Sequence, residues 1–292
     1  MTTQLRQNTP SWTFFNARPT PPASGNRIPH AVEGDQVAEL RFYGTSIPAS
    51  IQQEDLARLE PKQWLSDNLC TFYCYEAGNA YLKGAPGRAK DLVVLHARTW
   101  HLANWTHGFP KNVRVKGAIP TLEHKYVAFP GNDSETHFFL CIIIFPRDLL
   151  LEFNPSGPVR TTALILNSLQ QLPPSNPKEK VRSILFRLSE GRPLRDKELA
   201  RVKVLHPLMP QQPNGYDCGL YPGHFLSVFL GAPEAFTAHI LGEKTIEGAV
   251  DEIWNHSRIR YARQNLKDLV LASSEIQQAA FDFNTDVPLP VS

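Results

Sequence analysis

The sequence predicts an α+β fold in which helices pack around a central mixed β-sheet. Its most apolar stretch, residues 137–145 (HFFLCIIIF), is rich in β-branched and aromatic side chains and is followed by Pro146. This pattern is typical of a central strand buried on both faces. Segments 51–82 and 218–230 repeat apolar residues at spacings of three or four, which indicates helices. We expect the second helix to run against the sheet.

Further strands are predicted from short apolar runs on both sides of this stretch. The runs at 92–95 (LVVL) and 125–129 (KYVAF) suit strands. The run at 149–153 (LLLEF) follows 137–145 so closely that the two are predicted to form a hairpin, with its turn at Pro146 and Arg147.

The helices carry end signals of their own. Ser66 or Asp67 is predicted to cap the second half of the 51–82 helix. A last amphipathic helix is predicted over about 245–271, and it is expected to pack on the core.

Segments outside this core differ in composition. Residues 1–36 are rich in proline and show no helical or strand period, so we predict a disordered tail. One catalytic domain is predicted over 37–272 and a flexible C-terminal tail over 273–292. Segment 178–203 carries nine Lys or Arg against four acidic residues, which is compatible with a solvated helix and loop or with a contact surface for an acidic partner.

Composition excludes several classes of protein. The chain has 292 residues, of which 42% are hydrophobic, which is enough for a sizeable core. With 30 basic and 28 acidic residues the charge is nearly balanced, and we expect no nucleic-acid partner. Four irregularly spaced cysteines and no apolar run of about 18 residues predict a reducing compartment, nucleus or cytoplasm, and no membrane association. We expect a monomer.

Cys70 and Cys74 lie one turn apart on the apolar face of the first helix. A metal site would need two further ligands, for which His96 and His101 are the nearest candidates. Because no second cysteine pair exists, we interpret both thiols as small buried hydrophobic groups and expect no metal and no other cofactor.

The predicted hairpin has a geometric consequence. Two residues at equal distances from its turn lie opposite each other, and His137 and Asn154 satisfy this condition. They are therefore expected to be neighbours at the open end of the hairpin. The alternative is that both merely mark where strands meet solvent.

A cysteine begins the predicted central helix. Pro213, Asn214 and Gly215 predict a turn, Asp217 is a plausible N-cap, and Cys218 is then the first helical residue. A thiol at a helix N-terminus feels the positive end of the macrodipole, so its pKa is predicted to lie below the ordinary value.

Together these residues form the set that cysteine-protease chemistry requires. His137 would exchange a proton with Cys218 and then protonate the leaving amine, while Asn154 would orient the other ring nitrogen. Gln212, six positions before the thiol, could donate its side-chain amide to the developing oxyanion, together with a backbone amide near Cys218.

Three motifs resemble those of the SUMO-protease (ubiquitin-like-protein protease) family of cysteine peptidases, which is related in fold to the adenoviral protease. PQQPNGYDCG is similar to the nucleophile motif of the family, HFFLCIII to its histidine motif, and QWLSDNLCTFY to its Trp-Leu-Asn-Asp helix motif. The resemblance implies that the acidic member of the triad falls at Asn154.

The resemblance also implies a substrate, namely a ubiquitin-like modifier whose C-terminal Gly-Gly passes through a narrow aromatic tunnel. Trp64 matches one wall, Phe138 stands where the family has a second Trp, and Asp67 matches a residue near the modifier tail. Only residues without a Cβ pass between two stacked rings. Without the resemblance, Trp64 would be a core anchor and Asp67 a helix cap.

The predicted function is hydrolysis after the Gly-Gly of a SUMO-type modifier, in precursor maturation, deconjugation or both. Three departures qualify it: Asn154 in place of Asp orients the imidazolium without charge, Phe138 thins the tunnel, and Pro222 is expected to kink the helix beside the nucleophile. The alternatives are a catalytically impaired protein that binds the modifier without cutting it, and an acyltransferase on the same fold.

Overall fold

A five-stranded mixed sheet forms the centre of the molecule. The computed structural model describes residues 36–40, 48–84, 87–104, 120–133 and 137–285. Within them the sheet has the strand order β3-β4-β5-β6-β7. Its strands are β3 (Leu92–Val94), β4 (Tyr126–Asp133), β5 (His137–Ile144), β6 (Thr162–Leu166) and β7 (Lys203–Leu205). The three inner strands are antiparallel, and the outer strands run parallel to their neighbours. The predicted α+β fold with a mixed sheet is confirmed.

The strand predicted from the most apolar stretch is the central one. All eight residues of β5 are buried, as expected for a strand covered on both faces. The runs at 92–95 and 125–129 also form strands, β3 and the first half of β4. The β4 and β5 strands pair with Asp133 opposite His137, so His137 stands at the first position of the central strand.

The predicted hairpin between 137–145 and 149–153 is wrong. β5 pairs with β4 on one side and with β6 on the other. Phe145 takes a left-handed conformation (φ 50°), Pro146–Leu149 forms a 3-10 turn, and residues 151–153 continue in a turn. Leu149 and Leu150 are buried, whereas Leu151 and Phe153 are exposed, so the start of the run packs in the core and its end lies at the surface.

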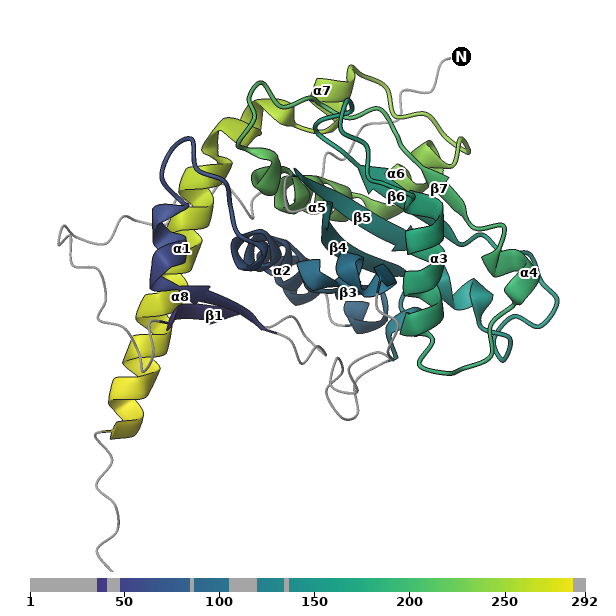
Figure 1. Ribbon diagram of the computed structural model, residues 1–292, viewed down its shortest axis with the longest axis horizontal. Helices are drawn as coiled ribbons and strands as arrows, with labels where there is room; N and C mark the ends of the chain where they lie inside the picture. Colours follow the sequence, from purple (N-terminus) through teal and green to yellow (C-terminus); the bar gives the residue numbers. More distant parts are fainter. Residues whose placement is uncertain (1–35, 41–47, 85–86, 105–119, 134–136, 286–292) are drawn as a thin grey trace, which may run out of the picture.

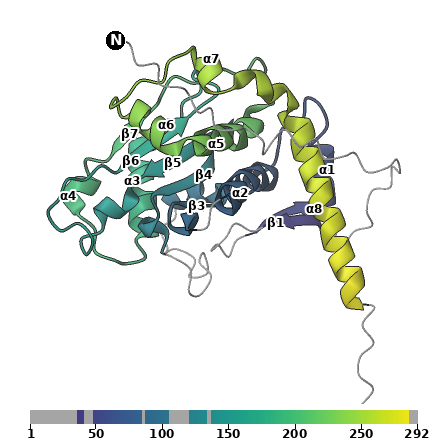
Figure 2. The same ribbon diagram turned by 180° about the vertical axis from the view of Figure 1, so that it is seen from behind.

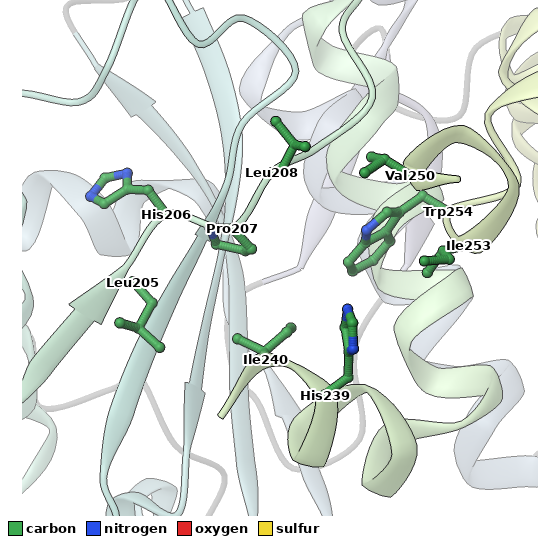
Figure 3. A pocket seen from close by; sticks show the side chains of 9 residues that line it. All are labelled: Leu205, His206, Pro207, Leu208, His239, Ile240, Val250, Ile253 and Trp254. Atoms are coloured by element: carbon green, nitrogen blue, oxygen red, sulfur yellow. The ribbon is translucent and has the colours of Figure 1, made fainter. Parts of the chain in front are cut away.

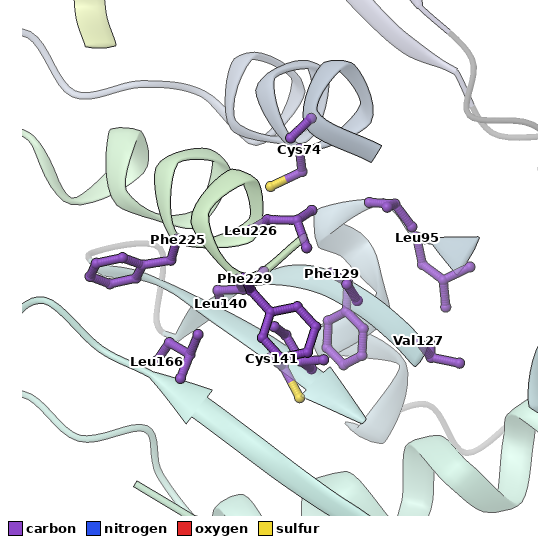
Figure 4. Packing of buried hydrophobic residues seen from close by; sticks show 14 of the residues in the cluster. Cys74, Leu95, Val127, Phe129, Leu140, Cys141, Leu166, Phe225, Leu226 and Phe229 are labelled. Carbon is purple, nitrogen blue, oxygen red and sulfur yellow. The ribbon is translucent and has the colours of Figure 1, made fainter. Parts of the chain in front are cut away.

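Helices cover the sheet on both sides (Figures 1 and 2). On one side lie α2 (Asp67–Lys83) and α5 (Tyr221–Gly231), and on the other lies α3 (Pro177–Leu188). Figure 4 shows Phe225, Leu226 and Phe229 of α5 among side chains from α2 and the strands. At Gly223 a Cβ would lie 2.3 Å from the Tyr73 ring, so glycine permits the close approach of α5 to α2.

The helix predicted over 51–82 is correct only in its second half. Residues before it form β2 (Ala49–Gln52), which pairs with β1 (Gln36–Leu40), and the short α1 (Gln53–Ala57). A loop then leads to α2, where the Ser66 side chain accepts a hydrogen bond of 3.3 Å from the Leu69 amide. Ser66 is therefore the cap.

The C-terminal part differs from the predicted 245–271 helix and 273–292 tail. After α6 (Pro233–Ile240) come α7 (Val250–Ile253), a turn with Asn255 in the left-handed region, and α8 (Ala262–Thr285). The α8 helix continues past residue 273. There the Gln277 side-chain amide accepts from the Glu39 backbone amide (3.1 Å) and donates to the Glu39 carbonyl (2.5 Å), which ties the helix to β1. Of the predicted tail over 1–36, residues 1–35 lie outside the described residues, and Gln36 begins β1.

The basic segment 178–203 folds as most of α3, α4 (Asp196–Leu199) and the first residue of β7, joined by loops. Among the described residues, no helix is long and apolar enough to span a bilayer.

Candidate active site

Cys218 opens a 3-10 turn, Cys218–Leu220, that leads directly into α5. Pro222 has no amide hydrogen to give to the Cys218 carbonyl, and the Tyr221 amide makes that bond instead, in 3-10 geometry. The disturbance predicted at Pro222 thus takes the form of a tight first turn. Asp217 occupies the N-cap position but makes no cap bond, because its carboxylate accepts from Asn214 and Arg263.

The thiol is almost fully covered. Cys218 is 5% exposed and packs against Cys70 of α2 and Phe138 of β5. Burial raises the pKa of Cys218, although backbone amides of Phe138, Gly219 and Cys218 act to lower it. The predicted lowering of the pKa is therefore wrong for the free protein, because desolvation of the thiolate outweighs the amides at the start of the turn.

His137 is held by a residue that the sequence interpretation missed. Its Nε2 lies 2.6 Å from Oδ1 of Asn167, the residue immediately after β6. The Asn167 amide group is fixed in turn, since Oδ1 also accepts from the Leu169 amide (2.8 Å) and Nδ2 donates to the Leu172 carbonyl (3.1 Å). The ring nitrogen that faces Oδ1 must be the donor, so neutral His137 carries its proton on Nε2.

The other ring nitrogen is left for chemistry. Among the described residues none is a hydrogen-bond partner of His137 Nδ1, which is buried. Burial lowers the pKa of His137, while the Asn167 hydrogen bond and the Asp133 charge oppose that shift. His137 is next to Phe138, whose backbone amide acts on the Cys218 sulfur. A neutral base and a protonated thiol therefore lie at the same end of β5.

The prediction that Asn154 neighbours His137 is wrong. Asn154 Nδ2 donates to the carbonyls of Asp148 (3.0 Å) and Pro158 (3.1 Å), and it holds the turn that follows β5. That turn lies at the far end of β5, and an eight-residue strand is about 25 Å long. The reasoning from equal distances failed because residues 149–153 do not pair with β5.

A signal for Asn167 is present in the sequence. TTALILN, residues 161–167, is an apolar strand pattern that ends in a carboxamide. It lies across the sheet ladder from β5, with Leu166 opposite Leu140. Residues from about 160 to 203 match the family poorly, so the resemblance does not point to Asn167.

Gln212 is buried and fixed close to the nucleophile turn. Its backbone amide donates to the Ser168 carbonyl (2.8 Å), and its Oε1 accepts from Ser168 Oγ (2.9 Å). Nε2 donates one of its two hydrogens to the Asn214 carbonyl (2.6 Å), and its second hydrogen is not used by this bond. Gln212 is thus tied to the residue after Asn167 and to the loop before Cys218.

The predicted substrate-binding residues meet in one hollow of about 270 Å³. Trp64, Asp67 and Phe138 line it together with Cys218. Trp64 is 49% exposed and Phe138 only 6%, so the indole is not a core anchor. The Asp67 carboxylate accepts from Asn132 Nδ2 (3.0 Å), and Ser66 performs the cap function, which leaves Asp67 in the wall of the hollow. Arg58, Leu65, Ser66, His101 and Asn132 complete the lining.

Three of the four residues considered as metal ligands, Cys70, Cys74 and His96, have other roles. Cys70 and Cys74 are buried and adjoin each other, and burial raises the pKa of Cys70. Both ring nitrogens of His96 make hydrogen bonds, one with Asn68 Oδ1 (3.2 Å) and one with the Arg98 amide (3.1 Å), so neither is available as a metal ligand.

A separate hollow of about 380 Å³ lies between the end of β7 and helices α6 and α7 (Figure 3). No cysteine lines this hollow.

Comparisons with known proteins identify the family of this chain. The family model described as the Ulp1 protease family, C-terminal catalytic domain, matches residues 98–263. Ubiquitin-like-specific protease 2 of Schizosaccharomyces pombe is 25% identical over 268 residues, which cover 78% of this chain and 41% of that protein. The chain thus spans less than half the length of this curated relative.

One solved structure with a TM-score above 0.5 shows the same fold. The structure described as a de-sumoylating protease has a TM-score of 0.64 at 18% identity, over 85% of this chain and 95% of that chain. The C-terminal Ulp1 protease domain in complex with Smt3, the yeast ortholog of SUMO, has a TM-score of 0.47 at 17% identity, over 86% and 99% of the two chains. The family resemblance read from the three sequence motifs is confirmed: this chain belongs to the Ulp1 protease family of cysteine peptidases.

Proposed function

We propose that this protein is a cysteine protease that hydrolyses the peptide or isopeptide bond after the C-terminal Gly-Gly of a SUMO-type modifier. The observation that carries the proposal is the pairing of His137 with Asn167. This hydrogen bond fixes the imidazole with Nδ1 unprotonated, and among the described residues Nδ1 has no hydrogen-bond partner. The next residue, Phe138, has the backbone amide that contacts the Cys218 sulfur. A base held in this way is what activation of a thiol requires.

In the first step His137 Nδ1 takes the thiol proton of Cys218 while the sulfur attacks the carbonyl carbon of the second glycine. Because the pKa of the histidine is lowered and that of the cysteine is raised, the pair starts neutral and charge develops only during attack. His137 therefore acts as a general base, and it does not form an ion pair with the thiolate beforehand.

The oxyanion formed by this attack needs donors. Gln212 Nε2 has a hydrogen beyond the one it gives to Asn214, and the backbone amides of Cys218 and Gly219 are close to the sulfur. The imidazolium then gives its Nδ1 proton to the leaving amine, and the C–N bond breaks to leave a thioester. Water, deprotonated by Nδ1, hydrolyses the thioester and regenerates the thiol.

The hollow supports a narrow, extended substrate tail. Trp64 and Phe138 border it, and the thiol lies in the same lining. A Gly-Gly tail is thin enough to lie between aromatic side chains because it carries no Cβ. Asp67 and Asn132 present polar groups to the backbone of that tail.

A second candidate, a modifier-binding protein without catalytic activity, is favoured by two observations. The residue that holds His137 is a carboxamide, and burial raises the pKa of the Cys218 thiol. Both features weaken the nucleophile without affecting the hollow.

We further propose that the protein works in a reducing compartment, nucleus or cytoplasm, since all four cysteines are free and buried.

The test uses the full chain with a SUMO C-terminal vinyl sulfone, a SUMO precursor and a SUMO isopeptide conjugate. The protease is expected to be labelled at Cys218 and to release products ending in Gly-Gly by mass spectrometry, and Cys218→Ala is expected to bind without cutting. Reversible binding of the wild-type chain with neither labelling nor products supports the binding protein instead. Comparison of the precursor and the conjugate separates maturation from deconjugation.

A further inference from the structure

Arg263, the second residue of α8, joins two segments of the site that are far apart in sequence. Its Nη1 donates to the carbonyls of Arg58 (2.8 Å) and Glu60 (3.2 Å), and its Nη2 donates to the Gln63 carbonyl (2.9 Å) and to Asp217 Oδ1 (2.7 Å). The four hydrogens of the two terminal nitrogens thus meet four acceptors. The side chain is only 13% exposed.

The three carbonyls belong to the loop that carries the wall of the hollow. This loop, residues 58–63, leads directly into Trp64 and Leu65. Leu65 packs on the nucleophile turn so closely that a Cβ at Gly219 would lie 2.8 Å from the Leu65 Cβ. The loop thus leads into both the aromatic wall of the hollow and the residue that packs on Gly219.

The carboxylate contact leads to the other side of the site. Asp217 Oδ2 accepts from Asn214 Nδ2 (2.8 Å), and the Asn214 carbonyl accepts from Gln212 Nε2 (2.6 Å). Asn214 Oδ1 also accepts from the amides of Tyr216 (3.1 Å) and Asp217 (3.0 Å). A continuous series of hydrogen bonds thus connects the guanidinium to the amide proposed for the oxyanion.

We propose that Arg263 is a positioning residue, which fixes the nucleophile turn and the Trp64 loop relative to each other through one guanidinium. The inference rests on the proposed protease function. A planar group with donors in a rigid fork can serve four acceptors at once, which a lysine ammonium on a flexible stem cannot do. The C-terminal helix is thereby part of the support of the active site.

The guanidinium also has an electrostatic role at the thiol. The Asp217 carboxylate, one residue before Cys218, raises the pKa of the thiol, and Arg263 supplies the compensating charge. Other charged or titratable groups surround the sulfur or its hollow, namely His137 on β5, Cys70 and Asp67 on α2, Arg58, and His101. Among these charges, removal of Arg263 takes away the one that pairs with Asp217, and it also removes the three bonds to the loop carbonyls.

Four variants of the full chain separate geometry from charge. Arg263→Met removes the fork and the charge, Arg263→Lys keeps the charge, and Asp217→Asn removes the carboxylate, alone and combined with Arg263→Met. Lys267→Met is the matched control, because Lys267 lies one turn further along α8 and binds the Glu60 side chain (2.7 Å) near the same loop without contacting Asp217.

Two measurements are made at a temperature where thermal unfolding shows each variant to be folded. The first is kcat/KM on a Gly-Gly substrate, and the second is the pH dependence of iodoacetamide alkylation at Cys218, followed by peptide mass spectrometry. Arg263→Met is expected to lose about 10- to 100-fold in kcat/KM and to shift the alkylation curve to higher pH. Arg263→Lys keeps the alkylation curve but loses activity, the double variant returns the curve toward wild type, and Lys267→Met changes neither.

The inference is overturned if folded Arg263→Met keeps kcat/KM within twofold of wild type and the alkylation curve unshifted, or if Lys267→Met has the same effect as Arg263→Met. If Arg263→Met does not fold, the same criteria are applied to kcat/KM of Arg263→Lys and to the alkylation curve of Asp217→Asn, which is expected to move to lower pH. Alkylation does not require protease activity, so failure of the proposed function is recognised separately, by a wild-type chain that cuts no substrate.

Discussion

Asn167 accepts a hydrogen bond of 2.6 Å from Nε2 of His137 across the edge where β5 begins and β6 ends. The carboxamide sets the tautomer and the orientation of the ring, but it adds no negative charge. A carboxylate at this position would add that charge. The identity of residue 167 thus determines how strongly an imidazolium is stabilised during catalysis.

Asn167→Asp is expected to increase the plateau value of kcat by about threefold to tenfold, because the carboxylate stabilises the imidazolium that forms during attack. The same charge raises the pKa of His137, so the acid limb of the rate profile moves to higher pH. Asn167→Ala should lower kcat by at least about 100-fold. The measurement is kcat on a Gly-Gly substrate between pH 5 and 9.

Asn154→Asp serves as the control for this prediction. Asn154 Nδ2 holds two carbonyls of the turn after β5, and an Asp side chain cannot donate to them. The variant is expected to lose about 1 to 3 kcal/mol of unfolding free energy with kcat unchanged in the folded protein. A change in kcat equal to that of Asn167→Asp would show that the site is organised around residue 154 after all.

The pH dependence of the wild-type rate follows from the two shifted groups. His137 must be neutral to accept the thiol proton, and burial lowers its pKa, so the rate should rise with pH through a midpoint below the ordinary histidine value of about 6.5. The Cys218 pKa is raised, so the thiol stays protonated through neutral pH. Measurement of kcat/KM on the free enzyme checks this, and a midpoint above about 6.5 contradicts the general-base mechanism.

Local patterns predicted much of the fold because burial follows from neighbouring residues. The apolar run 137–145 became the buried central strand, Ser66 capped α2, and Cys218 opened the turn before α5. Each of these features depends on a contiguous segment and on short-range hydrogen bonds. The same holds for the group of Trp64, Asp67 and Phe138, which the family motifs brought together.

The third member of the site was not predictable in this way. Which strand lies beside β5 depends on the turn at Phe145, whose left-handed conformation sends the chain away from the sheet before β6 returns. Burial of the thiol is likewise a tertiary effect, because Cys70 and Phe138 cover the sulfur from other elements. A helix N-terminus alone therefore predicted the wrong direction for the pKa of Cys218.

Phe138→Trp is expected to sharpen the selectivity for Gly-Gly, since a second indole would narrow the hollow beside Trp64. The ratio of kcat/KM for substrates ending in Gly-Gly and Gly-Ala should rise by about threefold to tenfold, and Trp64→Ala should lower kcat/KM for Gly-Gly by about 30-fold. An equal loss on both substrates in Trp64→Ala would indicate that the indole provides contact area without selecting for small residues.

Acid pH should destabilise the folded protein through two buried histidines outside the catalytic pair. Burial lowers the pKa of His96 and of His224 to about 4 each. His96 Nδ1 accepts from the Arg98 amide, which requires a neutral ring. His224 Nε2 donates to the Trp254 carbonyl, a bond that favours the charged ring, but burial outweighs it.

The sign of this effect is set by which state binds protons. Between about pH 6.5 and 4 the unfolded chain binds a proton on both rings and the folded chain does not. The unfolding free energy is therefore highest above about pH 7, falls as the pH drops through about 6.5, and levels off below about 4. Each histidine contributes a loss on the order of 3 kcal/mol in unfolding free energy over that window.

Urea unfolding at pH 8 and pH 5 measures this change in unfolding free energy. His224→Gln keeps a donor for the Trp254 carbonyl but has no proton to bind, so its unfolding free energy should change less between the two pH values than that of the wild type. An equal change in both proteins would mean that His224 is protonated without cost in the folded state.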